Sequence, residues 1–268
     1  MKNFLEKKII YWNTNSNIPT INNIIIEEPL SIRVNGIPYS VILRTPGDEV
    51  EHAAGFCLAK GLVDTPDDFI SISFCEDNDN TNLVDVAIRE KKKSLISNIL
   101  EQSPSVDQTS VDQTSIEQTN CEFCGNRKVL INKAKALSCL EDLSKYQPLR
   151  VKTRACHAAA LCNEDFEFLS VAEDVGRHNA LDKAVGKLFL KKMLDDAAIL
   201  ILSSRISYEL VQKAARAKIS VILAVSRPTS LAVQLALRLN ITLACFAPGS
   251  GLYIFTHEYR LRARPKIT

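Results

Sequence analysis

Two cysteines separated by two residues, Cys121 and Cys124, form the pair whose spacing most directly suggests chemistry. A neighbouring thiol, a basic side chain or backbone N–H groups can stabilise a thiolate. A thiolate can accept a sulfane sulfur and then hold it as a persulfide nucleophile. The pair could also be half of a structural zinc site completed by Cys156, His157 or Cys162, or an inert dithiol. The spacing alone leaves these three alternatives open.

A polar run at residues 173–183 follows a predicted strand and enters a predicted helix through Gly176. The free N–H groups of a helix start, with Arg177 and His178 beside them, suit a phosphate or another anion. His178 and Asp182 are four residues apart and share one helical face. The alternative is a capped helix with a surface salt bridge, but the density of polar residues favours a ligand site. The candidate residues are Asp174, Gly176, Arg177, His178, Asn179, Asp182 and Lys183.

Two other segments hold possible ligand contacts. His157 lies at the start of an apolar run that predicts a helix, although a single histidine is more often structural. A glycine-rich loop at 249–251 leads into a strand that is followed by Thr256, His257 and Arg260. Small residues let the backbone approach a ligand closely, so this segment could bind a purine or a phosphate. It could equally be an ordinary edge strand.

These candidates must be positioned by two halves of different pattern. In the first half, residues 24–43 predict a strand, an Asn35-Gly36 turn and a second strand. Apolar residues at helical spacing predict a helix at 50–62, and residues 69–88 predict two strands around a polar turn. The expected divisions are a flexible arm at 1–24, a small α+β domain at 25–102, a mobile loop at 103–125 and an α/β domain at 126–268.

In the second half, predicted strands alternate with helices of 10–15 residues. The strands are expected at 166–172, 197–202, 220–225 and 242–246, and the helices at 180–194, 208–217 and 229–239. This alternation predicts a largely parallel sheet covered by helices on both sides. Ligands of such sheets bind outside the carboxyl ends of the strands. The polar residues at 203–205, 226–227 and 248–249 follow three strands and should gather at one edge.

The composition limits the class of protein. Residues 105–119 hold three copies of a five-residue repeat, which predicts a solvated loop leading to Cys121. Lys+Arg 33 against Asp+Glu 31 gives a net charge of +2, so general nucleic-acid binding is not indicated. The chain has no apolar run of about 18 residues and no secretory signal. We therefore expect a cytoplasmic protein with no membrane span, in which the eight cysteines are reduced thiols.

Taken in order, these segments resemble the formate dehydrogenase accessory sulfurtransferases, the FdhD family. The matching pieces are Glu27–Gly36, Thr45–Asp48, Cys121–Gly125, His157–Leu161, Glu173–Lys183, Ser207–Ala215 and Pro228–Ala232. With the C-terminal stretch they run from about residue 27 to 260. A lone C-x-x-C is weak evidence, whereas the ordered series is specific.

The resemblance implies a sulfurtransferase with a defined cargo. Such a protein takes sulfur from a cysteine desulfurase as a persulfide, expected on Cys121 with Cys124 as partner. It passes the sulfur to the molybdenum (or tungsten) bis(molybdopterin guanine dinucleotide) cofactor, which it binds as a substrate and which formate dehydrogenase needs in sulfurated form. The resemblance also implies a three-layer α/β fold like that of cytidine deaminases in the C-terminal domain, and a homodimer. The cofactor-binding stretch that it implies is Phe255, Thr256, His257, Glu258, Tyr259 and Arg260.

We expect the 173–183 and 255–260 segments to form one pocket for this cofactor near Cys121, and we assign no metal site. This chain departs from the usual family residues at Arg154, Ala155, Arg205, Arg227 and Pro248. The fold analogy alone would suggest a deaminase, but His52 and His157 are each followed by Ala-Ala instead of the x-Glu that zinc deaminases need. A zinc-stabilised chaperone that only binds the cofactor is the rival hypothesis.

Overall fold

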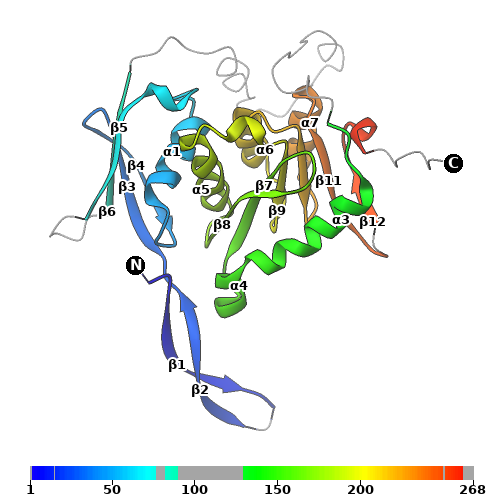
Figure 1. Cartoon of the computed structure of the whole chain (residues 1–268). Coiled ribbons are helices and arrows are strands. Elements are labelled where there is room, and N and C mark those ends of the chain that lie inside the picture. Colours follow the sequence, from blue (N-terminus) through cyan, green and yellow to red (C-terminus); the bar gives the residue numbers. More distant parts are fainter. Residues whose placement is uncertain (1, 15, 77–81, 90–128, 250, 262–268) are drawn as a thin grey trace, which may run out of the picture.

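The computed structural model describes residues 2–14, 16–76, 82–89, 129–249 and 251–261. Its strands form a two-stranded, a four-stranded and a six-stranded sheet. Figure 1 shows helices α1 (Glu49–Ala59) and α5 (Arg177–Leu190) between the two larger sheets, and the two-stranded hairpin projecting away from the body. The mixed α/β class expected from the sequence is confirmed.

Residues 4–25 form an antiparallel hairpin of β1 (Phe4–Trp12) and β2 (Asn17–Ile25). The sequence predicted only a flexible arm at 1–24 and did not predict these two strands. Polar side chains interrupt the apolar ones in both strands, so neither strand has a clean alternation in the sequence. The pairing becomes evident only when the strands are aligned, with Tyr11 opposite Ile18 and Phe4 opposite Ile25.

The four-stranded sheet has the order β4-β3-β6-β5. Its strands are β3 (Glu28–Val34), β4 (Ile37–Arg44), β5 (Phe69–Glu76) and β6 (Asn82–Ile88). Asn35 and Gly36 join β3 to β4 with φ angles of 49° and 79°, the left-handed geometry for which Asn-Gly is suited. Helix α1 covers the inner face, where Leu30, Ile32 and Val84 are buried. The strands and the helix predicted in this half are confirmed.

The six-stranded sheet has the order β12-β11-β10-β9-β7-β8. Its strands are β7 (His157–Cys162), β8 (Phe168–Asp174), β9 (Ile199–Leu202), β10 (Val221–Ala224), β11 (Thr242–Ala247) and β12 (Gly251–Ile254). Strands β9, β10 and β11 are parallel, whereas β7 runs antiparallel to β9 and β12 runs antiparallel to β11. The sheet is thus mixed, with a parallel centre.

The apolar run after His157, predicted as a helix, is strand β7. Its three alanines favour a helix by intrinsic propensity. However, the run is only six residues long and is buried between β8 and β9, and short apolar runs cannot be assigned by periodicity. Tertiary pairing decides its conformation.

Helices cover both faces of the six-stranded sheet. They are α5, α6 (Tyr208–Arg216) and α7 (Ser230–Arg238) on one face and α3 (Lys133–Asp142) on the other. Alternate residues of each strand enter two separate apolar clusters, so Leu200 and Leu202 pack with one layer while Ile199 and Ile201 pack with the other. The cluster that contains Leu200 and Leu202 continues into the four-stranded sheet, so the two units share one core. The remaining short elements are α4 (Pro148–Thr153), η1 (Pro66–Asp68), η3 (Leu143–Tyr146), η4 (Leu194–Asp196) and η5 (Glu258–Arg260).

Helices α1 and α5 cross with their backbones in close contact at two glycines. A Cβ on Gly55 would overlap the carbonyl group of Asp182, and a Cβ on Gly186 would overlap the carbonyl oxygen of Glu51. Glycine is therefore the residue that allows this approach. The close crossing fixes the start of α5, where several predicted site residues lie.

Candidate functional site

Cys121 and Cys124 lie outside the described residues, as does the loop predicted at 103–125. The chain re-enters the described structure at Val129. Two residues later, the backbone N–H of Ile131 donates a hydrogen bond of 2.7 Å to the carbonyl oxygen of Arg260, and Ile131 forms an isolated parallel bridge with Leu261. The C-terminal candidate stretch therefore lies beside the segment that follows the two cysteines in sequence.

Two residues of that stretch, Thr256 and Arg260, are buried. The Thr256 hydroxyl donates to the carbonyl oxygen of Ile241 (2.7 Å) and accepts from the N–H of Leu243 (2.8 Å). The Arg260 guanidinium donates to the hydroxyl of Thr242 (3.2 Å). Both side chains fasten the end of β12 to the start of β11, so their visible role is structural.

The other residues of the stretch are more open. Phe255, Glu258 and Tyr259 are exposed, and His257 is partly exposed with its backbone in the left-handed region (φ 51°). The Tyr259 hydroxyl donates to the side chain of Asn240 (2.6 Å), and the rings of Tyr259 and His257 meet edge to face with their centres 5.9 Å apart. Aromatic surfaces of this kind are where a nucleobase can stack.

The 173–183 segment and His157 lie near the opposite ends of the strands of the six-stranded sheet, away from the 255–260 stretch. His157 pairs with Asp174, and two residues further along β7 Ala159 pairs with Leu202, the last residue of β9. Thr256 instead contacts residues at the start of β11, which runs parallel to β9. The expectation of one pocket formed by 173–183 and 255–260 is therefore wrong within a single chain. The cause is the antiparallel return of β12.

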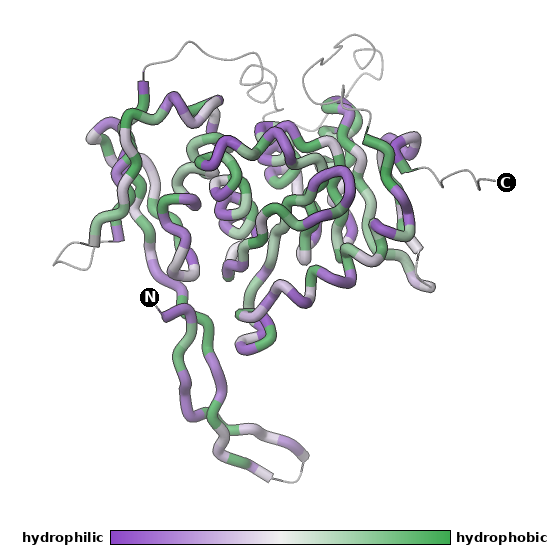
Figure 2. The backbone as a smooth tube through the Cα atoms, viewed as in Figure 1, coloured by the Kyte–Doolittle hydropathy of each residue, from purple (hydrophilic) through white to green (hydrophobic). Residues whose placement is uncertain are grey.

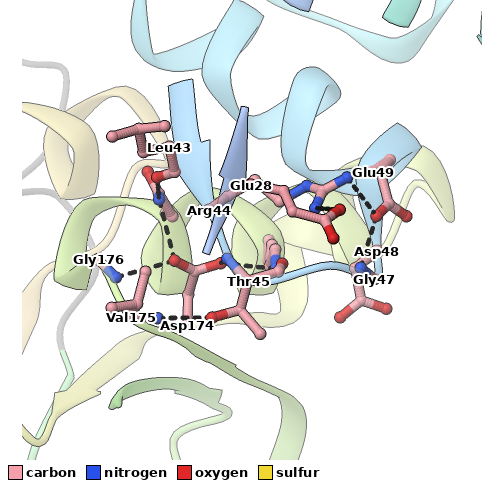
Figure 3. Close-up of polar contacts among 12 residues, drawn as sticks. Glu28, Leu43, Arg44, Thr45, Gly47, Asp48, Glu49, Asp174, Val175 and Gly176 are labelled. Carbon is pink, nitrogen blue, oxygen red and sulfur yellow. Dashed lines mark hydrogen bonds and ion pairs between the residues drawn. The ribbon is translucent and has the colours of Figure 1, made fainter. Parts of the chain in front are cut away.

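Asp174 lies at the junction between the two units, next to Thr45 and Gly176 (Figure 3). It forms a buried ion pair with Lys183, in which the Oδ2–Nζ distance is 2.7 Å and the side chains of Asp174 and Lys183 are 0% and 2% exposed. The Asp174 carboxylate also accepts from the backbone N–H groups of Thr45 (3.1 Å) and Gly176 (2.8 Å), and Lys183 donates to the carbonyl oxygen of Thr45 (2.7 Å). The charged groups of these two predicted ligand residues are engaged in contacts that hold the end of β4 to β8 and α5.

Asn179 completes the same junction. Its side-chain N–H₂ group donates to Asp174 (2.9 Å) and to the carbonyl oxygen of Leu43 (2.8 Å). Sequence reasoning missed Arg44, the residue that follows Leu43. Its side chain is fully buried and pairs with Glu49 (3.1 Å) and Glu28 (3.4 Å). Its only signal was an arginine ending an apolar strand, immediately before the Thr-Pro-Gly-Asp turn.

Three basic side chains near the start of α5 stay partly open: His157, Arg177 and His178. His157 Nδ1 and Arg177 Nε are buried atoms that make no hydrogen bond among the described residues. His178 Nε2 lies 2.9 Å from the carboxylate of Glu209 and 3.3 Å from the hydroxyl of Ser207. Gly176 precedes the helix without a side-chain cap, so this edge offers N–H groups and a positive charge to an anion.

The pKa of each of these two histidines is shifted downward. Burial lowers the pKa of His157, and the charges of Arg177 and Arg150 lower it further. Burial also lowers the pKa of His178, although the nearby carboxylate of Glu209 opposes the shift. Both imidazoles are therefore mainly neutral at pH 7, and Arg177 supplies the permanent charge.

Asp182 lies in a neighbouring cleft of about 530 Å³ between α1, α5 and α6. Its carboxylate pairs with Lys213 at 2.6 Å. Burial raises the pKa of Asp182, while Lys213 opposes that rise. Lys60, His178, Glu209 and Arg216 also line the cleft, so its walls carry both basic and acidic groups.

The loops that follow the three parallel strands gather at one edge, as predicted. The residues after β9 and β10 meet where Ile206 bridges Pro228. The Arg227 guanidinium lies 5.0 Å from the ring centre of Tyr253 on β12. The N–H of Ala158 donates to the hydroxyl of Ser203 (2.8 Å), which places this edge next to His157.

Cys156 is poorly suited to be a zinc ligand. Its thiol lies 3.2 Å from the carboxylate of Glu173, and burial together with Glu173 raises the pKa of Cys156 to about 12. A zinc site needs thiolates. In the described part of the chain, no three His, Cys, Asp or Glu side chains gather closely enough to hold a metal ion. None of the helices in the described ranges is long and apolar enough to span a bilayer.

Comparison with known proteins agrees with this architecture. The chain is 36% identical over 263 residues to the protein named sulfur carrier protein FdhD of Mycobacterium tuberculosis, covering 88% of this chain and 90% of that protein. It is 33% identical over 239 residues to the protein of the same name from Sulfurisphaera tokodaii, covering 88% and 90%.

A crystal structure described as a formate dehydrogenase accessory protein from Desulfotalea psychrophila matches the fold with a TM-score of 0.77. At 22% identity, the match covers 97% of this chain and 100% of that one, and it shows the fold alone. The model of the FdhD/NarQ family matches residues 25–262, nearly the whole chain. This chain therefore belongs to the FdhD/NarQ family.

Proposed function

We propose that this chain is a sulfur carrier in which Cys121 receives sulfur from a cysteine desulfurase. The observation that carries the proposal is the Cys121-Glu-Phe-Cys124 motif in a chain whose relatives are named sulfur carrier proteins. Val129 follows Cys124 by five positions, so the chain between their Cα atoms can span at most about 18 Å. Because the backbone of Ile131 is hydrogen-bonded to that of Arg260, this chain length allows Cys121 and Cys124 to reach the 255–260 stretch.

The proposed sulfur transfer is balanced by the second cysteine. The Cys121 thiolate attacks the outer sulfur of a desulfurase persulfide, becomes a persulfide itself and releases the desulfurase thiolate. Delivery as sulfide requires two electrons. The Cys124 thiolate supplies them by attacking the Cys121 sulfur, which forms a Cys121–Cys124 disulfide and releases the outer sulfur as HS⁻. A cellular dithiol then restores the pair.

We propose the molybdenum bis(molybdopterin guanine dinucleotide) cofactor as the substrate that receives this sulfur. The exposed aromatic surfaces of Phe255 and Tyr259 would support a stacked guanine. The start of α5, with Arg177 Nε and His157 Nδ1 buried and without hydrogen-bond partners among the described residues, would support a phosphate. The aromatic surface and the start of α5 lie near opposite ends of the strands of the six-stranded sheet, so they would hold different parts of the substrate.

The proposal implies two protein partners, the cysteine desulfurase and the catalytic subunit of formate dehydrogenase, and it implies a homodimer in the cytoplasm. The decisive experiment incubates the purified chain with a desulfurase and cysteine. Intact-mass analysis should show the addition of one sulfur atom on Cys121 that dithiothreitol removes. Cys121→Ala should lose this adduct and fail to support formate dehydrogenase activity in cells, whereas Cys75→Ala, at an exposed thiol on β5, should keep both. An active Cys121→Ala chain would disprove the carrier role.

The rival function is a zinc-stabilised chaperone that binds the cofactor without carrying sulfur. It predicts stoichiometric zinc in the purified chain that is lost in Cys124→Ala. Metal analysis and the sulfur adduct together separate the two functions, because bound zinc would occupy the thiolates that the sulfur carrier needs free.

A further inference from the structure

The β1–β2 hairpin projects from the body and carries apolar residues along both strands (Figures 1 and 2). It begins before residue 25, where the family match begins. Among the described residues, its contacts with the body lie at its base. The N–H of Ile26 donates to the carbonyl oxygen of Asn3 (3.0 Å), and the Lys152 ammonium group lies 4.9 Å from the ring centre of Phe4.

One face of the hairpin is especially open. Ile10 and Trp12 are two residues apart and share a face, and Ile21 joins them because it pairs with Lys8. Ile10 is 68% exposed, Trp12 82% and Ile21 70%. The opposite face carries Tyr11 and Ile18, which pair with each other and are also exposed. An isolated two-stranded hairpin is marginally stable in water, so this arm needs a surface to pack on.

The apolar area of the arm matches what a stable protein interface needs. The large apolar side chains that are exposed on the arm are Leu5, Ile10, Tyr11, Trp12, Ile18, Ile21 and Ile24. At roughly 200 Å² for a fully exposed side chain of this size, the exposed fractions of all seven amount to roughly 800 Å², of which Ile10, Trp12 and Ile21 supply roughly 400 Å² on one face. The largest apolar patch on a typical monomer is about 300–600 Å². A standard interface buries about 800 Å² on each partner.

The tip of the hairpin is polar. Asn13 accepts hydrogen bonds from the N–H (2.8 Å) and hydroxyl (3.1 Å) of Ser16, and Thr14 and Asn17 flank this turn. A hairpin that dips into a bilayer would place its most apolar residues at the tip. Here the apolar belt lies along the strands behind a hydrated turn, which suits an arm laid across another protein.

We propose that the β1–β2 hairpin is a dimerisation arm that packs, through the Ile10, Trp12 and Ile21 face, on a second copy of this chain. In a two-fold dimer the contact is reciprocal. Each arm would bury roughly 400 Å² of this face and a similar area on the body of the partner copy, so two reciprocal arms would bury roughly 800 Å² on each copy, the area of a standard interface. The inference rests on the homodimer of the proposed function and is independent of its sulfur chemistry.

Trp12 is the only tryptophan in the chain, so its fluorescence reports directly on the proposed contact. Dilution of the full-length protein, followed by light scattering and fluorescence, should show dimer dissociation together with a red shift of Trp12 emission and greater quenching by iodide. A dimer in which Trp12 emits as a fully solvated indole would overturn the proposal, as would a monomer at every concentration. A blue shift that needs phospholipid vesicles would assign the arm to a membrane instead.

Substitutions test the same contact without relying on fluorescence. Ile10→Ser/Ile21→Ser should raise the dimer dissociation constant at least about tenfold, because buried apolar anchors dominate interface energies and each change occurs twice in the dimer. Ile70→Ser on β5 is the matched control, since Ile70 is equally exposed (67%) but lies outside the arm. If both variants shift dimerisation equally, or neither does, the arm is not the contact. The fluorescence measurement on the unmodified chain decides the question even if the serine variant unfolds the hairpin.

Discussion

Removal of the Asp174 carboxylate tests whether the buried junction holds the two units together. Asp174→Ala leaves the Lys183 ammonium group buried, with the carbonyl oxygen of Thr45 as its remaining hydrogen-bond partner in the junction. It also removes the acceptor for the N–H groups of Thr45 and Gly176. Loss of one partner of a buried ion pair costs about 3–5 kcal/mol. Because whole domains are stable by only about 5–15 kcal/mol, the variant should lose about a fifth or more of its stability.

Equilibrium urea unfolding, followed by circular dichroism, measures this loss. The matched control is Asp67→Ala, which removes the partner of Lys192 in a pair of the same type at 2.6 Å, with side chains 63% and 70% exposed. Exposed pairs contribute about 0–1 kcal/mol, so the control should unfold almost as the unmodified protein does. The difference between the two variants isolates the effect of burial.

A double variant separates the ion pair from the general effect of truncation. Asp174→Ala/Lys183→Met removes both charges, so its cost should fall below the sum of the single variants by about 2 kcal/mol or more. Strictly additive single effects would refute the reasoning, as would a cost of less than about 1 kcal/mol for Asp174→Ala.

Three further outcomes follow from the packing. Gly186→Ala should destabilise the chain by about 3 kcal/mol or more, because the new Cβ would overlap the carbonyl oxygen of Glu51. Gly251→Ala, where a Cβ has room, should be nearly neutral, and thermal unfolding of both variants measures the difference. Burial lowers the pKa of His52 well below its usual value of about 6.5, so the unfolded state binds more protons and stability should fall as the pH drops below about 6.5. His52→Leu should reduce that pH dependence in urea titrations. Brief alkylation followed by peptide mass mapping should label Cys75 ahead of the other five described cysteines, because it alone among them is exposed.

The features that local chemistry determines could be predicted from the sequence. Asn35-Gly36 specifies a turn because both residues adopt positive φ, and the structure has that turn. The apolar runs at 197–202 and 220–225 specify buried central strands, and β9 and β10 lie there. The alanine run after His157 was misassigned because its local propensity and its tertiary pairing favour different conformations.

The site was harder to predict because its geometry depends on partners that are distant in sequence. Asp174 has the residue type of a ligand contact, but Thr45, its hydrogen-bond partner, lies 129 residues earlier in the chain. The separation of the 173–183 and 255–260 segments depends on the direction of β12. The glycine-rich sequence at 249–251 is compatible with a tight turn, which makes β12 antiparallel to β11, and with a crossover, which would make it parallel. The two alternatives would place Thr256 at opposite ends of the strands.

The shared core and the buried junction also bear on how the covalent connection between the two halves can evolve. Since side chains from β4, β8 and α5 already fasten the halves, residues 90–128 need not do so. Doubling the length of a flexible connection costs only about 0.6 kcal/mol in closure entropy. Duplication of a pentapeptide upstream of Cys121 would thus be nearly neutral for folding, so the number of repeats can change without loss of the contacts between the two halves.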